Sequence, residues 1–377
     1  MNLQKEIRVI KNIVKWVVII AAILFIGIWS FVTFSPAFGD APSGEGLARV
    51  NASKNYNGEV FVNLIETKIQ TPDPENEQSI AGFLYRIFFP PEGKNPTKPL
   101  PTKKLNGNEL KNGQFVWLGH STILFKTNGK HIITDPVFFN ASPIPGSLSQ
   151  FDMENRPLIA DLPEKIDVVL ISHDHYDHLD YRAILELDER VVRYLVPLGV
   201  GAHLKHWGVD ESKIEEKDWY ESVRYSSIKF IFTPSRHFSG RGLSDRFSTL
   251  WGSWVIQSDS LNVFFSGDSG YFDEFKKIGE LFGPFDIAFM ENGAYNTNWN
   301  EIHFMPEQSV QASKDLNAKL MFPIHWAKFD LSVHPWKEPI LRANKAAELD
   351  SVILVTPLIG EVFTLDAPPK KDWWEFE

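Results

Sequence analysis

Short apolar runs that end in polar or charged clusters recur along the chain. The run 168–171 is uninterrupted and rich in β-branched residues, which predicts a fully buried strand. Comparable runs predict further strands at 122–127, 131–134, 228–233, 252–257, 262–265, 286–290, 320–324, 351–355 and 361–365. Asn128-Gly129 separates the first two of these and is a strong signal for a hairpin turn. Helical patterns occupy 181–190, 271–282, 306–316 and 338–349.

This order of elements predicts one α/β catalytic domain over residues 113–366. Hairpins mixed with strand–helix units favour two facing mixed sheets with helices on their outer faces. Before this domain, residues 36–112 are expected to form an irregular arm that includes a loop at 42–46. The prolines within 89–101 support this, because proline removes a backbone donor and fixes φ. After the domain, residues 367–377 form a tail whose Trp373-Trp374-Glu375-Phe376 resembles an interfacial aromatic anchor.

A long apolar run near the amino terminus predicts a transmembrane helix over residues 16–35. Residues 16–39 carry no charge, and about 20 apolar residues suffice to cross a bilayer. A cleavable signal peptide is the alternative, because Ala37-Phe38-Gly39 places small residues at suitable positions. The run is longer than the roughly 7–15 residues typical of signal sequences, which favours an uncleaved anchor.

The charges that flank this run predict its orientation. Residues 1–15 hold one acid, Glu6, and four basic residues, Lys5, Arg8, Lys11 and Lys15. Basic flanks stay in the cytoplasm, so residues 1–15 are expected to be a cytoplasmic tail. The catalytic domain is then expected on the outer, periplasmic side of a bacterial inner membrane, with a single crossing of that membrane.

Composition excludes several classes of function. The 377 residues, 43% of them hydrophobic, can bury the core of one large domain with an appendage. The net charge is −10, and no basic patch offsets it, which argues against a nucleic-acid partner. The chain has no cysteine, so disulfides, thiolate nucleophiles and cysteine-based zinc sites are excluded.

The most informative polar cluster follows the strand at 168–171. Residues 173–178, called the metal loop below, hold three histidines and two aspartates. They lie at the carboxyl end of a buried strand, where open α/β sheets place their ligand sites. His173 and His175 alternate along the chain, so both imidazoles can converge on one ion, and imidazole with carboxylate suits zinc or another first-row metal. A solvated polar turn is the alternative for a single loop of this kind.

Three further strands end in a residue that can bind a metal. His237 follows the strand at 228–233, Asp268 follows 262–265, and His325 follows 320–324. A solvated turn does not predict this repetition. The sequence therefore predicts a metal site to which the ends of several strands contribute.

The metal loop followed by His237, Asp268 and His325, in that order, resembles the metallo-β-lactamase fold of dinuclear metallohydrolases. Other short sequence motifs resemble those of one branch of this fold, which contains N-acyl-phosphatidylethanolamine-hydrolysing phospholipase D and its bacterial relatives. These motifs are Trp117-Leu118-Gly119-His120-Ser121-Thr122, Thr134-Asp135-Pro136, Ser235-Arg236-His237, Gly267-Asp268-Ser269-Gly270-Tyr271, Gly293-Ala294-Tyr295 and Pro323-Ile324-His325-Trp326. The resemblance covers roughly residues 115–364, fades over 292–299 and implies an αββα sandwich.

The resemblance also implies a dinuclear site. By position, one metal is bound by His173, His175 and His237, and the other by Asp177, His178 and His325, with Asp268 bridging the two. The cofactors implied are two divalent ions, expected to be Zn²⁺. Such a pair holds a bridging hydroxide that attacks the substrate, and Asp177 faces it. Asp177 and Asp268 are therefore counted as catalytic as well as metal-binding.

Two residues are expected to support the ligands from outside. Asp135 matches an acid that orients a metal-bound imidazole in this fold, with a simple turn aspartate as the alternative. His120 is assigned the same role, with a satisfied core histidine as the alternative.

Other polar residues are assigned to substrate or to the scaffold. His303 precedes the helix at 306–316, and the resemblance places it beside the scissile group, in substrate contact or proton transfer. Arg236 and Arg241 flank His237 and are expected to contact phosphate, with ordinary surface arginines as the alternative. Tyr295 lies in the segment expected to line the substrate mouth. The remaining histidines are read as structural: His131, His203, His206 and His334.

The function implied is that of a membrane-anchored dinuclear phosphodiesterase. Its expected substrate is a phospholipid of the N-acyl-phosphatidylethanolamine type, cleaved as by a phospholipase D. One alternative is a lactonase or another ester hydrolase of the same fold. A second is a non-catalytic, membrane-tethered binding protein, which would be expected to have lost ligands, whereas all seven are present. Head-group preference, acyl preference and oligomeric state stay open.

Overall fold

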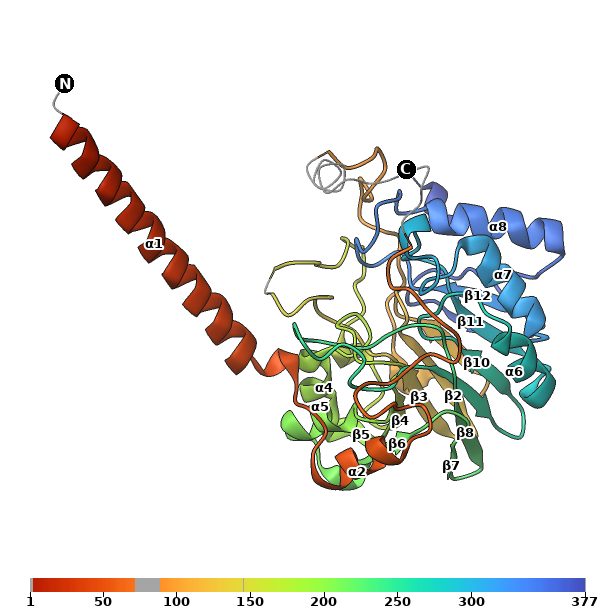
Figure 1. Cartoon of the computed structure of the whole chain (residues 1–377). Coiled ribbons are helices and arrows are strands. Elements are labelled where there is room, and N and C mark those ends of the chain that lie inside the picture. Colours follow the sequence, from red (N-terminus) through yellow and green to blue (C-terminus); the bar gives the residue numbers. More distant parts are fainter. Residues whose placement is uncertain (1–2, 72–88, 145, 377) are drawn as a thin grey trace.

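The computed structural model describes residues 3–71, 89–144 and 146–376, and two β-sheets face each other in it (Figure 1). The first sheet has the strand order β13-β1-β2-β3-β4-β5-β6 and the second has the order β12-β11-β10-β9-β8-β7. The first contains β1 (Gln114–Trp117), β2 (Ile123–Thr127), β3 (Lys130–Thr134), β4 (Ile166–Leu170), β5 (Val191–Pro197), β6 (Ile214–Lys217) and β13 (Val362–Thr364). The second contains β7 (Ser222–Tyr225), β8 (Ile228–Thr233), β9 (Ser253–Gln257), β10 (Asn262–Phe265), β11 (Ile287–Glu291) and β12 (Met321–Ile324).

Helices cover the outer face of each sheet. The first sheet packs against α4 (Tyr181–Leu187) and α5 (Gly201–His206), through a core cluster that includes Ile184 and Leu204. The second sheet packs against α6 (Glu274–Phe282), α7 (Pro306–Asp315) and α8 (Glu338–Asp350) (Figure 1). This is the αββα sandwich that the sequence predicts.

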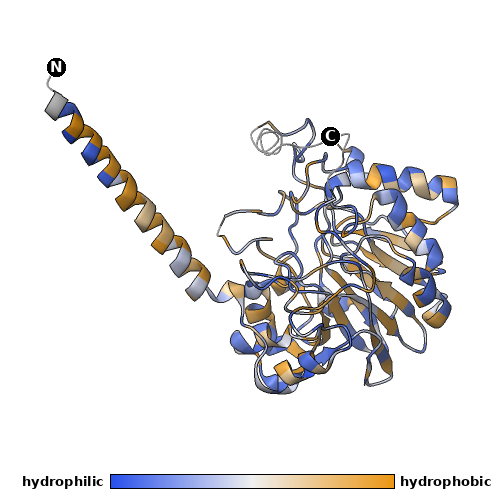
Figure 2. Cartoon of the chain, viewed as in Figure 1, coloured by the Kyte–Doolittle hydropathy of each residue, from blue (hydrophilic) through white to orange (hydrophobic). Residues whose placement is uncertain are grey.

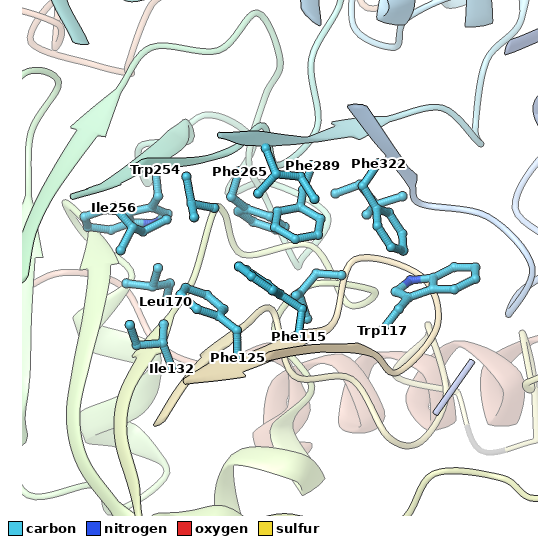
Figure 3. Packing of buried hydrophobic residues seen from close by; sticks show 14 of the residues in the cluster. Phe115, Trp117, Phe125, Ile132, Leu170, Trp254, Ile256, Phe265, Phe289 and Phe322 are labelled. Atoms are coloured by element: carbon cyan, nitrogen blue, oxygen red, sulfur yellow. The ribbon is translucent and has the colours of Figure 1, made fainter. Parts of the chain in front are cut away.

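Large aromatic side chains fill the space between the two sheets (Figure 3). In β1, Phe115 and Trp117 point into this layer, whereas Val116 points to the helices, as the alternation of a strand requires. Phe115 lies 6.0 Å from Phe289 of the opposite sheet, and Trp117 lies 5.6 Å from Phe322, measured between ring centroids. Because both faces of these strands are buried, their sequences read as continuous apolar runs.

The predicted elements are largely confirmed, with two differences and several omissions. The hairpin turn is present, with Asn128 and Gly129 both in the left-handed region at φ 47° and 74°. The helix expected at 271–282 begins three residues later, at Glu274. The strand expected at 351–355 is absent from the described residues there, where only Leu354 forms a bridge, to Met321. The sequence patterns missed β1, β5, β6, β7 and α5.

The amino-terminal run forms one long exposed helix, α1 (Leu3–Phe34), as Figures 1 and 2 show. At 1.5 Å per residue its length is about 48 Å, more than the roughly 30 Å hydrocarbon core of a bilayer. It is long and apolar enough to cross a membrane. The predicted span 16–35 lies within this helix except for its last residue, and the basic residues that precede the span belong to the same helix. Residues 1–2 lie outside the described residues.

The predicted arm is less irregular than expected. It contains a short 3-10 helix, Pro36–Phe38, and the helix α2 (Gly44–Ala52), so the loop expected at 42–46 is wrong. Helix α2 is held because Val50 is buried and Arg49 pairs with Glu216 and Glu221. Residues 72–88 of the arm lie outside the described residues.

The carboxyl-terminal tail belongs to the core. Trp373 and Trp374 are 8% and 2% exposed, and Trp373 stacks on Trp326 at 5.2 Å between ring centroids. The expectation of an interfacial aromatic anchor is therefore wrong for both tryptophans, because the domain itself buries these rings.

Candidate metal centre

The predicted ligands meet at one edge of the sandwich because they follow strands that end there. The metal loop follows β4, His237 follows β8, Asp268 follows β10 and His325 follows β12. Strands β10, β11 and β12 are parallel neighbours, so their carboxyl ends lie side by side. Segments that are distant in sequence thus bring ligands to a common site.

Three histidines form the first group. The Nε2 atom of His173 lies 2.9 Å from Nδ1 of His175, and the Nε2 atom of His237 lies 3.2 Å from that same Nδ1. Burial lowers the pKa of His173 and of His237 well below the ordinary histidine value, and neighbouring histidines lower both further. Neutral imidazoles with converging nitrogens offer lone pairs, which is what a cation requires.

The second group gathers around Asp177. Its Oδ2 atom lies 3.2 Å from Nε2 of His325 and 3.5 Å from Nε2 of His178. Burial opposes charge on both histidines, but Asp268 and Asp177 outweigh it. The pKa of His325 is raised to about 10, and the pKa of His178 is also raised. This half of the site therefore attracts positive charge, from protons or from a metal.

Asp268 lies between the two groups. Its Oδ1 atom is 3.1 Å from Nε2 of His178, and its Oδ2 atom is 3.1 Å from Nε2 of His325 and 3.8 Å from Nε2 of His237. Asp268 Oδ1 and His178 Nε2 are buried and have no hydrogen-bond partner of good geometry within the described residues. Orphaned buried polar atoms are costly, so this donor set fits divalent metal ions better than it fits a bare protein core.

Asp135 supports the second group from outside. Its Oδ2 atom accepts a hydrogen bond from Nδ1 of His178 at 2.7 Å and another from Oγ of Ser172 at 2.6 Å. Its Oδ1 atom accepts from the backbone N–H of Ser172 at 2.8 Å. These bonds fix the ring so that Nε2 faces Asp268 and Asp177, which is the geometry expected of a residue that orients a ligand.

His120 was expected to support the ligands from outside, but it contacts one of them directly. Its Nε2 atom is 3.0 Å from Oδ2 of Asp177, within the cluster formed with His178 and His325. Burial and the neighbouring His325 lower its pKa to about 3, so the ring is neutral and donates to the carboxylate. His120 thus either orients Asp177 or shares in metal binding, and the supporting role stays a prediction.

Glu291 is a site residue that the sequence reading missed. It ends β11, is fully buried, and its Oε1 atom lies 2.5 Å from Nδ1 of His303. Its Oε2 atom accepts from the backbone N–H of Ser269 at 2.8 Å. Burial lowers the pKa of His303, but the negative charges of Glu291 and Asp268 raise it by more, so the pKa lies above the ordinary histidine value. The rule that found Asp268 applies to Glu291 too, but the strand was expected to end one residue earlier.

The arm adds a further residue that no motif signalled. The side-chain amide of Asn63 donates to the carbonyl of His237 at 2.8 Å and accepts from the N–H of His237 at 3.2 Å. Trp251 donates to the same Asn63 oxygen at 3.2 Å. Part of the predicted arm therefore fixes the backbone of a candidate ligand.

The three residues assigned to substrate are engaged by the protein. Arg236 pairs with Glu301 at 2.7 Å and also donates to the carbonyl of Glu66. Arg241 is 3% exposed, and its donors face backbone carbonyls. The hydroxyl of Tyr295 donates to Glu338 at 2.5 Å. These contacts give each side chain a structural role, and the contact of the three residues with substrate stays a prediction.

The four histidines read as structural have protein partners, and none contacts a candidate ligand within the part of the chain that the structure describes, although His203 contacts Asp174 of the metal loop. His131 contacts the carbonyl of Lys165 and His334 contacts that of Gly293. His203 contacts Asp174, and His206 lies 3.8 Å from Asp40.

Comparison with known proteins gives the family. The model of the beta-lactamase superfamily domain matches residues 131–326, about half of the chain. The chain belongs to this superfamily. An uncharacterized protein of Mycobacterium tuberculosis is 36% identical over 348 residues, which cover 90% of this chain and 92% of that protein. The N-acyl-phosphatidylethanolamine-hydrolyzing phospholipase D 1 of Caenorhabditis elegans is 32% identical over 296 residues, which cover 73% of this chain and 83% of that protein.

A solved structure agrees on the fold. Igni18, a metallo hydrolase from the archaeon Ignicoccus hospitalis, aligns with a TM-score of 0.50 and 21% identity. The alignment covers 67% of this chain and 97% of that one. Family, fold and the buried histidine–aspartate cluster together identify a metal-dependent hydrolase of the metallo-β-lactamase fold.

Replacing Asp135 with asparagine is expected to weaken metal binding about 10–100-fold, the usual cost of losing a partner of a ligand. The asparagine amide cannot accept all three hydrogen bonds that converge on the carboxylate. Titration with a fluorescent chelator measures the affinity. Asp167→Asn, near the amino-terminal start of the neighbouring strand β4, is the matched control. Equal affinities of the Asp135 variant and wild type would contradict the assigned role.

Proposed function

We propose that this hydrolase is a dinuclear phosphodiesterase that cleaves phospholipids of the N-acyl-phosphatidylethanolamine type in the manner of a phospholipase D. The observation that carries the proposal is Asp268, which contacts both histidine groups in a chain related over most of its length to such a phospholipase. We further propose two metal sites, occupied by Zn²⁺: His173, His175 and His237 for one, Asp177, His178 and His325 for the other, with Asp268 shared.

The proposed roles follow from the contacts of each residue. Two divalent ions in such a site lower the pKa of a water molecule and offset charge on a phosphoryl oxygen. Asp177 and His303 are 15% and 14% exposed, whereas Asp268 is 2% exposed, so the first two face the opening of the site. Asp177 orients the attacking water by accepting its hydrogen bond. His303 shares its Nδ1 proton with Glu291 and presents Nε2 to the leaving alcohol, as a proton donor.

A hollow beside the metal loop supports a lipid substrate. It has a volume of about 350 Å³ and lies between the end of α1 and the catalytic domain. Its lining is rich in apolar and aromatic residues: Phe31, Pro36, Phe139, Pro143, Tyr176 and Tyr181. Tyr176 belongs to the metal loop, so a lipid chain that leaves the bilayer along α1 would arrive next to the ligands.

The substrate class is tested with the full chain in lipid nanodiscs. We expect release of phosphatidic-acid-type product from N-acyl-phosphatidylethanolamine, and slower cleavage of soluble bis-4-nitrophenyl phosphate by the same preparation. Parallel assays with a lactone and a thioester address the other ester hydrolases of this fold. Rapid lactone opening without phosphodiester cleavage would replace the proposal, and inactivity of the metal-loaded chain on all three classes would favour a binding protein.

The orientation in the membrane is a separate prediction. The basic residues of α1 favour a cytoplasmic amino terminus and a catalytic domain on the periplasmic side. Alkaline phosphatase fused after Glu377 is therefore expected to be active in a bacterial host. β-Galactosidase, which works only in the cytosol, is expected to be silent at the same position. The reverse pattern of reporter activities would contradict this orientation.

A further inference from the structure

The segment that follows α1 is bound to the back of the metal loop by one buried arginine. The Nε and Nη2 atoms of Arg241 donate to the carbonyl oxygen of Ala37, at 3.0 and 2.8 Å. Its Nη1 atom donates to the carbonyls of Asp174 and Leu179, at 2.6 and 2.9 Å. One guanidinium therefore connects residue 37 to both ends of the stretch that carries His175, Asp177 and His178.

A second set of contacts also holds this segment. The backbone N–H of Asp40 donates to Nδ1 of His203 at 3.1 Å, so Nε2 of that ring carries its proton and faces Oδ2 of Asp174 at 3.3 Å. Trp207 donates from Nε1 to the carbonyl of Pro36 at 2.7 Å. Asp174 lies between the candidate ligands His173 and His175. Residues 36–40 are therefore linked to the metal loop through Arg241, which contacts the carbonyl of Asp174, and through His203, which contacts its side chain.

Gly39 is required by this arrangement. It adopts φ 74°, and a Cβ atom placed there would lie 2.0 Å from Nδ1 of His203. A residue with a side chain would have to push the segment away from His203. The small residue that looked like part of a signal-peptidase site therefore has a structural reason of its own.

We propose that residues 36–40 are a permanent part of the catalytic domain and that Arg241 is a positioning residue, which holds the metal loop through this segment. Removal of the chain up to Gly39 would take away the carbonyls of Pro36 and Ala37. Three buried donors, two on Arg241 and one on Trp207, would then lose their acceptors, which is costly for buried groups and most so for a charged one. The structure thus favours a helix α1 that stays attached, over a signal peptide that is cleaved off.

The test compares full-length variants in nanodiscs, with Zn²⁺ alone as the probe. Arg241→Gln and Gly39→Ala are expected to weaken Zn²⁺ affinity about 10–100-fold, as the loss of outer partners of a metal site does. They are also expected to be cut faster by chymotrypsin after Phe38, because the segment is released. Arg246→Gln, an exposed arginine nearby, is expected to match wild type in both measurements.

Gly39→Ala also separates the two readings of the amino terminus. Alanine is as acceptable as glycine to signal peptidase, so a signal peptide would still be cleaved in this variant, whereas the proposal expects intact mass to show residues 1–39 retained. A mature wild-type chain that begins at Asp40 would overturn the proposal. So would Zn²⁺ affinity that is unchanged in both variants although chymotrypsin now cuts them quickly. None of these measurements uses a phospholipid, so they stand even if the substrate proves to be different.

Discussion

Replacing Asp268 with asparagine is expected to abolish both catalytic turnover and metal binding. Asp268 contacts both groups: its Oδ1 lies 3.1 Å from His178 and its Oδ2 3.1 Å from His325 of the second group, and Oδ2 also lies 3.8 Å from His237 of the first. An asparagine keeps one acceptor oxygen and turns the other position into an N–H donor, which cannot bind a cation. Because one residue serves both groups, the loss should exceed the roughly 10–100-fold cost of removing an outer partner.

Metal content and turnover are measured on the same preparation. Wild type is expected to contain about two metal ions per chain, as a dinuclear site requires. The Asp268 variant, and His175→Ala beside it, should lose metal together with hydrolysis of bis-4-nitrophenyl phosphate. Asp286→Asn, at the amino-terminal end of β11 and paired with Lys319, is the matched control and should keep both. A preparation that is fully active without bound metal would overturn the assignment of the whole site.

The candidate ligands could be predicted from sequence because each follows a strand that is buried on both faces. Such strands leave an uninterrupted apolar run, and the polar residue that ends the run marks the sheet edge. Glu291 obeys the same rule and was missed only because its strand was expected to end at Met290. Asn63 could not be found in this way, since it comes from a loop of the arm and acts on the backbone of His237.

Two of the missed strands lie at a sheet edge, where the apolar pattern is lost. Strands β6 and β7 lie at the ends of their sheets and none of their residues is buried, so polar residues such as Glu215 and Arg224 interrupt any apolar run. Strand β5 is interior, yet Arg193 breaks its run and pairs with Glu215 of β6 at 2.7 Å. Residue type alone did not reveal these pairings.

Side-chain roles that depend on distant neighbours were the least predictable part. Arg241 and Tyr295 have residue types suited to phosphate or substrate, but the fold supplies partners for both. The same holds for Trp373, which was expected at a membrane surface and instead stacks on Trp326 and packs against Trp336. The residue type limits the contacts that such a side chain can make, whereas the packing of the fold determines which of these contacts form.

Replacing His303 with alanine is expected to lower turnover about 10²–10⁴-fold, the usual contribution of a positioned proton donor, while metal content stays at the wild-type level. The Nδ1 atom of His303 is bonded to Glu291 at 2.5 Å and lies 3.9 Å from Asp268. His303 also groups with His237 and Asp268, and we expect its bond to Glu291 to keep it from binding the metal. His131→Ala is the control and should retain turnover, because His131 lies near the amino-terminal start of β3, away from the strand ends that carry the ligands.

Glu291→Gln distinguishes two roles of Glu291, as the partner of His303 or as a metal ligand. If Glu291 only orients and charges the imidazole, glutamine still accepts the Nδ1–H hydrogen bond. Turnover should then fall less than in His303→Ala, with metal content unchanged. If Glu291 is itself a ligand, as its grouping with Asp268 and His325 allows, metal content should fall with turnover. Loss of metal in His303→Ala would show that His303 binds metal, and the proton-donor role would then be wrong.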